Sequence, residues 1–99
     1  MEESQQLGGN IELAGFKEVD GGSMIILKKI IGSYARKFSD KLNGIEKLSI
    51  SVKKVGNSQF EVSGALHKEG QQYNSEIVDY NLFVGIDKVL KKIEGSVLK

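Results

Sequence analysis

The sequence predicts an α+β fold with the element order β-α-β-β-β-α, in which a four-stranded mixed sheet carries two helices packed on one face. Two segments, residues 24–42 and 82–99, place apolar residues at three- and four-residue steps, the spacing of an amphipathic helix. The other segments alternate apolar and polar residues, the spacing of a strand with one buried face. The chain has 99 residues and no cysteine, which fits one domain whose core forms without disulfides.

The N-terminal part is expected to be a flexible tail, residues 1–9, followed by a single domain, residues 10–99. The tail is polar and ends in two glycines. In residues 10–19 apolar and polar residues alternate at first, which predicts the first strand. The alternation slips at Gly15, which predicts a bulge or the end of that strand.

The first helix is expected over residues 24–42. Residues 20–22 form a break typical of a loop, and Ser23 is a candidate N-cap. Asn43 and Gly44 are typical of a helix end. The apolar stripe of this helix consists of Leu27, Ile30, Ile31, Tyr34, Phe38 and Leu42.

Three more strands are expected over residues 45–55, 58–67 and 71–79, with short turns between them. Each alternates apolar and polar residues, which predicts an antiparallel sheet covered on one side only. The last helix, residues 82–99, has Asp79 and Asn81 as alternative caps.

Both helices must bury an apolar stripe, so we expect them side by side on the one apolar face of the sheet. A right-handed crossover would make the first strand parallel to the strand that follows the first helix. The outward sides of the helices are mostly positive. Residues 24–42 hold five basic residues and one acidic residue, and residues 82–99 hold four and two. The two helices could therefore present a single basic surface in a protein of net charge +1.

No catalytic or metal-binding pattern is recognisable in the sequence. His67 is the only histidine and is expected on the polar sheet face, where a base would need a positioned partner. There is no cysteine nucleophile, no HExxH pair and no phosphate loop. Residues 20–23, just before a helix, could bind an anion, and they are the one feature that favours a small-molecule enzyme. We therefore expect a protein that is not an enzyme and that uses no cofactor or metal.

The apolar runs are too short for a membrane helix, which needs roughly 18 residues. The start Met1-Glu2-Glu3 also differs from a signal peptide. We therefore expect a cytoplasmic protein without a membrane partner.

The segment EIVDYNLFVGIDKVLKKIE, residues 76–94, resembles the ribosome hibernation promoting factor (ribosome-associated inhibitor) family. That family ends its last strand in an acid-rich run, followed by an aromatic residue, a small residue, Ile-Asp and a helix rich in lysine and leucine. The order and lengths of the elements agree with the family over residues 10–99. The matching positions are Phe83, Gly85, Ile86, Asp87, Lys91 and Lys92.

The resemblance implies a fold akin to the double-stranded RNA-binding domain, and binding to the small ribosomal subunit through basic residues on the helices. The leading hypothesis is therefore a ribosome- or RNA-binding module that regulates translation by occupancy. The alternative is a protein–protein interaction or structural domain that self-associates through the polar sheet face or the edge of the first strand. The residues that the resemblance would place against RNA phosphates are Lys28, Lys29, Arg36, Lys37, Lys88, Lys91 and Lys92.

Overall fold

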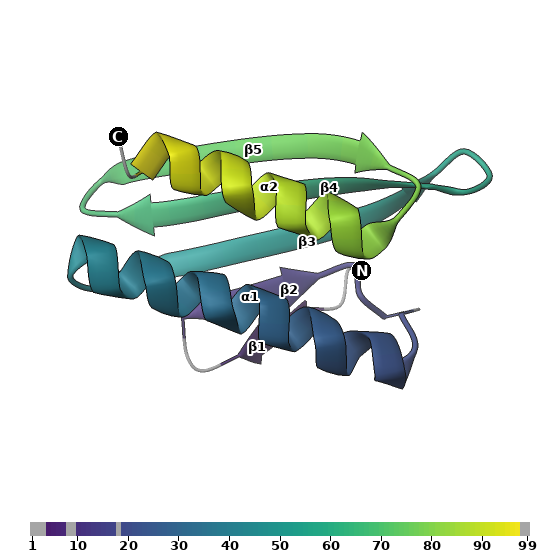
Figure 1. The fold of residues 1–99 in the computed structure, drawn as a ribbon, viewed down its shortest axis with the longest axis horizontal. Helices are drawn as coiled ribbons and strands as arrows, with labels where there is room; N and C mark the ends of the chain where they lie inside the picture. The colour runs from purple at the N-terminus through teal and green to yellow at the C-terminus, as the bar shows by residue number, and fades with distance from the viewer. Residues whose placement is uncertain (1–3, 8–9, 18, 98–99) are drawn as a thin grey trace.

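The computed structural model has two layers, a five-stranded sheet and a pair of helices on one of its faces (Figure 1). It describes residues 4–7, 10–17 and 19–97. The strands follow one another across the sheet in chain order. They are β1 (Ser4–Leu7), β2 (Ile11–Ala14), β3 (Lys47–Val55), β4 (Gln59–Lys68) and β5 (Gln71–Asp79), and the helices are α1 (Gly21–Leu42) and α2 (Leu82–Val97).

The predicted order of one strand, a helix, three strands and a second helix is confirmed from β2 onward. β2 pairs parallel with β3, while β3, β4 and β5 pair antiparallel through short hairpins. The sheet is therefore mixed, as the crossover through α1 requires. The bounds of β5 agree with the prediction. β2 ends at Ala14, just before Gly15 with its positive φ of 82°, so the slip in alternation at Gly15 marks the end of the strand and not a bulge.

The prediction of a flexible tail is wrong for Ser4–Leu7, which forms β1 and pairs antiparallel with β2. Without β1, the outer edge of β2 would leave a row of backbone N–H and C=O groups unpaired. This pairing uses backbone groups, so the polar residues of β1 show no apolar alternation that sequence analysis could detect. Residues 1–3 and 8–9 of the predicted tail lie outside the described residues.

α1 begins three residues earlier than predicted, and its N-cap is Asp20 rather than Ser23. The Ser23 backbone N–H donates to Asp20 Oδ2 at 3.0 Å, and Ser23 Oγ donates to Asp20 Oδ1 at 2.8 Å. These two hydrogen bonds stabilise the ionised carboxylate and lower the pKa of Asp20. The helix ends as predicted at Asn43, whose φ of 60° is left-handed, followed by Gly44 at 103°.

Asn81 caps α2, which decides between the two predicted candidates. Asn81 Oδ1 accepts a hydrogen bond from the Val84 backbone N–H at 3.2 Å. Asp79 lies before this cap, and its Oδ1 accepts a hydrogen bond from the Asn81 backbone N–H at 2.9 Å. The helix is described to Val97, and the last two residues of the predicted helix, Leu98 and Lys99, lie outside the described residues.

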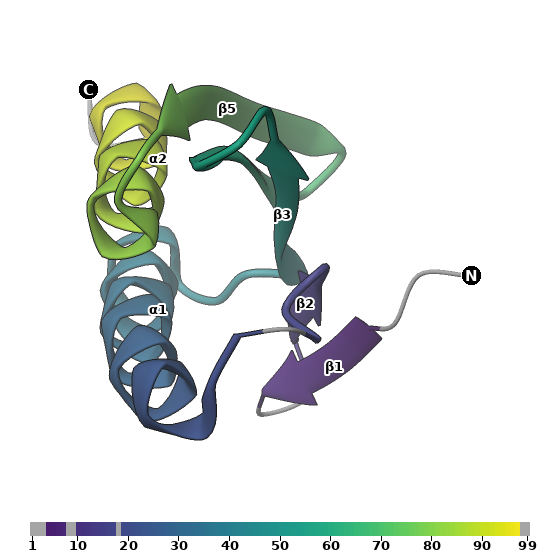
Figure 2. The same cartoon turned by 90° about the vertical axis from the view of Figure 1, so that its right-hand side faces the viewer.

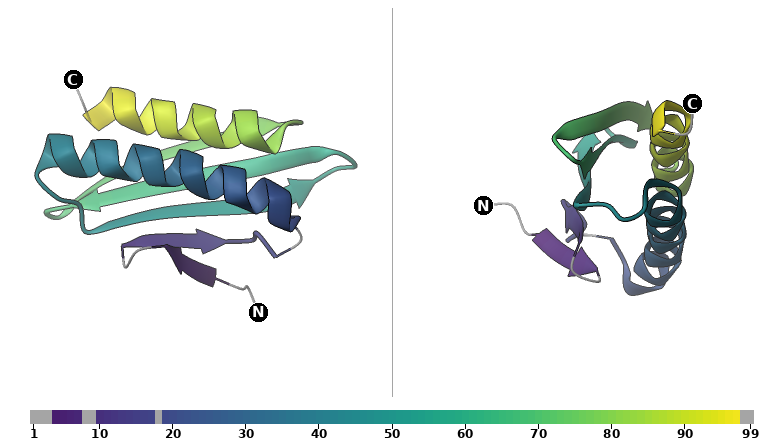
Figure 3. Two further views of the ribbon diagram at one scale, coloured as in Figure 1. Left: turned by 60° about the horizontal axis from the view of Figure 1, so that its bottom comes forward. Right: turned by 90° about the vertical axis from the view of Figure 1, so that its left-hand side faces the viewer.

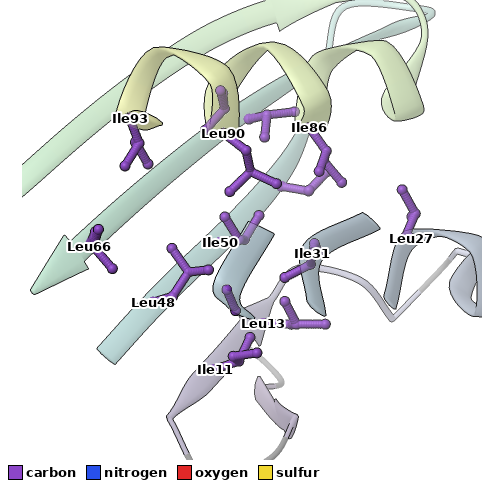
Figure 4. Close-up of a cluster of buried hydrophobic side chains, with 14 of the residues drawn as sticks. Ile11, Leu13, Leu27, Ile31, Leu48, Ile50, Leu66, Ile86, Leu90 and Ile93 are labelled. Carbon is purple, nitrogen blue, oxygen red and sulfur yellow. The ribbon is translucent and has the colours of Figure 1, made fainter. Parts of the chain in front are cut away.

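The core lies between the two layers, where the sheet curves around the helices (Figures 2 and 3). The apolar stripes of both helices meet the inner sides of β2, β3 and β4 there, as the close-up in Figure 4 shows. Among the described residues no charged or polar side chain is fully buried in this core. The largest fully buried side chains include Phe38, Leu13, Leu27, Ile31, Leu48, Ile50, Leu66, Ile86, Leu90 and Ile93.

Gly64 allows α2 to pack closely against β4. A Cβ atom at this position would lie 2.7 Å from Val89 Cγ1 and 3.1 Å from Ile93 Cδ1, both on α2. From the other side, a Cβ on Gly85 of α2 would lie 3.2 Å from Val62 Cγ2 of β4. The strand and the helix therefore each contribute a glycine to their contact, and the buried Val89 is too stiff at χ1 to move aside easily.

We expect Gly64→Ala to lower the free energy of unfolding by about 1–3 kcal/mol, because the added methyl group overpacks the contact with Val89. The matched control is Gly32→Ala in α1, where an added Cβ meets no atom within 4 Å. This control should be neutral or more stable by up to about 1 kcal/mol, since alanine is the better helix former. Urea unfolding followed by circular dichroism measures both. Equal midpoints for the two variants would contradict the close packing at Gly64.

Candidate nucleic-acid interface

The outward side of α1 presents Lys28, Lys29 and Arg36, all of them exposed. The buried positions Leu27, Ile31, Ala35 and Phe38 of the same helix determine this orientation, because residues between them on the helical repeat must point away from the core. Among the described residues, no acidic side chain forms an ion pair with any of these three cations. Three of the four predicted phosphate contacts on α1 therefore have no ion pair among the described residues.

Two of the predicted cations on α2 form ion pairs with nearby carboxylates. Lys88 Nζ lies 3.3 Å from Asp79 Oδ2 at the end of β5, and Lys91 Nζ lies 3.2 Å from Asp87 Oδ2 one turn earlier. The pKa of Asp79 is lowered, chiefly by the hydrogen bond from the Asn81 N–H and further by Lys88. Lys92 is exposed and has no ion pair among the described residues.

The two helices are joined by a polar seam, formed by Tyr34 and Lys37 of α1 with Asp87 and Glu94 of α2. Tyr34 Oη donates to Asp87 Oδ1 at 3.0 Å, and Lys37 Nζ lies 3.0 Å from Glu94 Oε2. Lys37 Nζ also lies 5.2 Å from the centre of the Tyr34 ring, within cation–π range. The seam thus engages Lys37, a predicted phosphate contact, in holding the helices together.

The structure brings the predicted cations onto one helical layer but divides them into two groups. Lys37, Lys88 and Lys91 have carboxylate partners, whereas three of the other four lie on α1. Sequence analysis missed the pairing of Lys37 because Glu94 is 57 positions away along the chain. The spacing of Asp87 and Lys91, four apart on one helix, could have revealed their pair.

Sequence analysis also missed two exposed apolar side chains at the start of α1. Ile25 is 60% exposed and Ile26 is 51% exposed, one helical turn before Lys28 and Lys29. They lie off the buried stripe, and the described residues leave more than half of each side chain exposed. Apolar atoms beside cations can contact ribose and base edges while the cations contact phosphates.

The outer face of the sheet is polar and slightly hollowed. A depression of about 410 Å³ lies over the centre of β3, β4 and β5. Its lining has no aromatic residue on which a base could stack. Nearby, Lys47 Nζ pairs with Glu12 Oε1 at 2.9 Å, which leaves this face without a strong charge of one sign. The lining consists of Ser49, Ser51, Ser63, Gly64, Ala65, Asn74, Ser75 and Glu76.

The candidate anion site at residues 20–23 is taken by the protein's own carboxylate. Asp20 accepts the Ser23 N–H that an anion would need, and its negative charge would repel such a ligand. In the part of the chain that the structure describes, no group of His, Asp and Glu is arranged to hold a metal ion. No helix in this part is long and apolar enough to cross a membrane.

Comparison with known proteins does not extend these observations. No model of a known protein family matches the sequence, and no curated protein matches it.

The environment of Tyr34 in the seam predicts that this side chain loses its proton only at high pH. Partial burial, together with the hydrogen bond to Asp87, raises the pKa of Tyr34 to about 12 from its ordinary value of 10.0. Because the folded-state pKa is raised, the stability that Tyr34 contributes is complete below pH 10 and is lost as the pH rises toward 12. We expect the difference in unfolding free energy between wild type and Tyr34→Phe to shrink over this range.

Ultraviolet absorbance of tyrosinate measures the titration directly. The wild-type chain has three tyrosines, and the variant Tyr34→Phe should lose a component of the titration near pH 12. An unchanged absorbance near pH 12 would contradict the hydrogen bond between Tyr34 and Asp87.

Proposed function

We propose that this protein binds structured RNA, on the small ribosomal subunit, through the outward side of α1. The observation that carries the proposal is the exposed set Lys28, Lys29 and Arg36, which has no acidic partner among the described residues. The first and last of these positions are eight residues apart, about 12 Å along the helix axis. A rigid row of cations of this length can neutralise several phosphates at once and release their counterions.

The ion-paired lysines contribute less to RNA affinity than their number suggests. To contact a phosphate, Lys37 must leave Glu94, and Lys91 must leave Asp87, so each gains a phosphate contact at the expense of an existing one. If only Lys28, Lys29, Arg36 and Lys92 bind phosphates, the logarithm of the association constant should fall against the logarithm of salt concentration with a slope of about −3 to −4. Participation of all seven predicted cations would give about −5 to −6.

The protein acts by occupancy in this proposal, as a cytoplasmic factor that needs neither catalysis nor a cofactor. The residues behind the family resemblance support it indirectly, because several of them have structural roles in this fold. Gly85 packs closely against Val62, Ile86 is fully buried, and Asp87 belongs to the seam. These residues position α2 beside α1, so they are consistent with a shared fold that presents a basic helical layer.

The first test is the double variant Lys28→Glu and Lys29→Glu, compared with the matched control Lys53→Glu and Lys54→Glu. Both change the net charge by the same amount at exposed positions, but the control residues lie on β3 rather than on α1. We expect the α1 variant to abolish co-sedimentation with small subunits and the control to retain most of it. A fluorescence titration with duplex RNA at two or more salt concentrations measures the slope. Equal losses for both variants would show that net charge, rather than α1, determines binding.

The seam gives a second test, in which a substitution is expected to strengthen RNA binding instead of weakening it. Glu94→Gln removes the partner of Lys37 and leaves a polar side chain of similar shape. We expect RNA affinity to rise and the salt slope to become steeper by up to about one unit, because one more cation is available. Circular dichroism checks that the fold is retained. An unchanged slope would place Lys37 outside the interface.

A further inference from the structure

The sheet has two edges, and they differ in how well they are protected. It ends in β1, with four residues, on one side and in β5, with nine, on the other. Edge strands of monomeric proteins commonly carry lysine, proline or a bulge that prevents further pairing. Gln71–Asp79 contains neither lysine nor proline, and its pairing with β4 has no bulge. Figure 1 shows this strand along the margin of the sheet.

The β4–β5 hairpin determines which backbone groups of β5 face the open edge. Its loop is Glu69 and Gly70, both with positive φ, which is typical of a two-residue turn. In such a hairpin the flanking pair, Lys68 and Gln71, is hydrogen-bonded, and every second residue of β5 after Gln71 then bonds to β4. The residues between them direct their N–H and C=O groups to the open edge, and they are Gln72, Asn74, Glu76 and Val78.

Ser75, at the middle of β5, has an unsatisfied hydroxyl group. Its Oγ is the one buried side-chain polar atom without a hydrogen-bond partner in the part of the chain that the structure describes. Its neighbours on the same side of the strand, Tyr73 and Ile77, pack against the core but are only partly buried. A buried hydroxyl without a partner is unfavourable and calls for an explanation. A chain at this edge would cover both apolar side chains, and a rotation of Ser75 about χ1 would bring its hydroxyl group within reach of that chain.

We propose that a second copy of this protein occupies this edge, with the two β5 strands antiparallel about a two-fold axis through Ser75. Ser75 then faces Ser75 of the second copy in a closely spaced pair, where one hydroxyl donates and the other accepts. Tyr73 faces Ile77, and the amide of Asn74 faces the carboxylate of Glu76. A shift of the axis to Glu76 would place like charges opposite each other, which disfavours that register.

This proposal is independent of RNA binding. The sequence offered two surfaces for self-association, the polar sheet face and the edge of the first predicted strand. That edge is the outer edge of β2, which β1 covers. No described strand pairs with the outer edge of β5. Glu76 is its one carboxylate without an ion pair among the described residues, because Asp79 is paired with Lys88. The two-fold axis would be perpendicular to the sheet, so that both helical layers lie on the same side of one continuous sheet.

A single thiol tests the axis. The chain has no cysteine, so Ser75→Cys introduces the only one, with little change in shape. Facing residues of a non-hydrogen-bonded pair have Cα atoms about 4.5 Å apart, within the range that a disulfide spans. We expect mild oxidation to give a covalent dimer on a non-reducing gel. The control Ser58→Cys, at an exposed turn, should give much less. Equal yields from both variants would overturn the axis.

A pair of opposite charges at one position tests the register. Asn74 is exposed on the outer face, so neither Asn74→Glu nor Asn74→Lys should disturb the fold. Opposite Glu76, the glutamate is repelled and the lysine attracted, twice per dimer. We expect the dimer dissociation constant from analytical ultracentrifugation to rise roughly 2- to 30-fold for Asn74→Glu and to fall for Asn74→Lys. Weaker association of both would overturn the register. A wild-type chain that stays monomeric up to near-millimolar concentration would overturn the proposal as a whole.

Discussion

The single apolar face of the sheet is the constraint on which the rest of the structure depends. Leu48, Ile50 and Leu66 on the inner side of β3 and β4 are fully buried, whereas the outward residues of the same strands are mostly polar. Each helix has one apolar stripe, so both must cover the same face and lie side by side. Gly64 has no side chain on the inner face of β4, so Val89 of α2 packs directly against the strand at this point.

Two positively charged helices that lie side by side repel each other, and the acidic residues of the seam offset this repulsion. Lys37 of α1 meets Glu94 of α2, and Asp87 accepts the hydrogen bond of Tyr34 while pairing with Lys91. The acidic residues of α2 thus stabilise the contact between the helices, and α2 presents less positive charge than its sequence suggests. The basic character that remains for a ligand lies mainly on α1. The single basic surface that the sequence predicted across both helices is therefore uneven.

Local patterns predicted the elements well, because the periodicity of buried side chains is itself local. The two-residue spacing of Tyr73, Ser75 and Ile77 predicted a strand with the bounds of β5, and Asn43 with Gly44 predicted the end of α1. Features that depend on distant parts of the chain were missed. β1 exists because β2 has an edge to pair with, and the partner of Lys37 comes from another helix. At the start of α1 the sequence favoured Ser23 as the cap. Asp20, three residues earlier, takes that role because its carboxylate accepts two hydrogen bonds from Ser23.

Pairing of two copies through β5 would raise RNA affinity most in a protein whose basic surface is small. Figure 2 shows α2 beside β5 and α1 level with β2, so pairing would put the two α2 helices near the axis and the two α1 helices outermost. With neighbouring strands about 4.8 Å apart, the α1 helices would lie roughly 30 Å from each other on one side of a continuous sheet. Once one α1 holds an RNA, the second binds it as part of the same complex, at a high effective concentration. A chain with a net charge of only +1 could in this way bind RNA tightly by doubling one modest surface, without the dense positive charge that a single site would need.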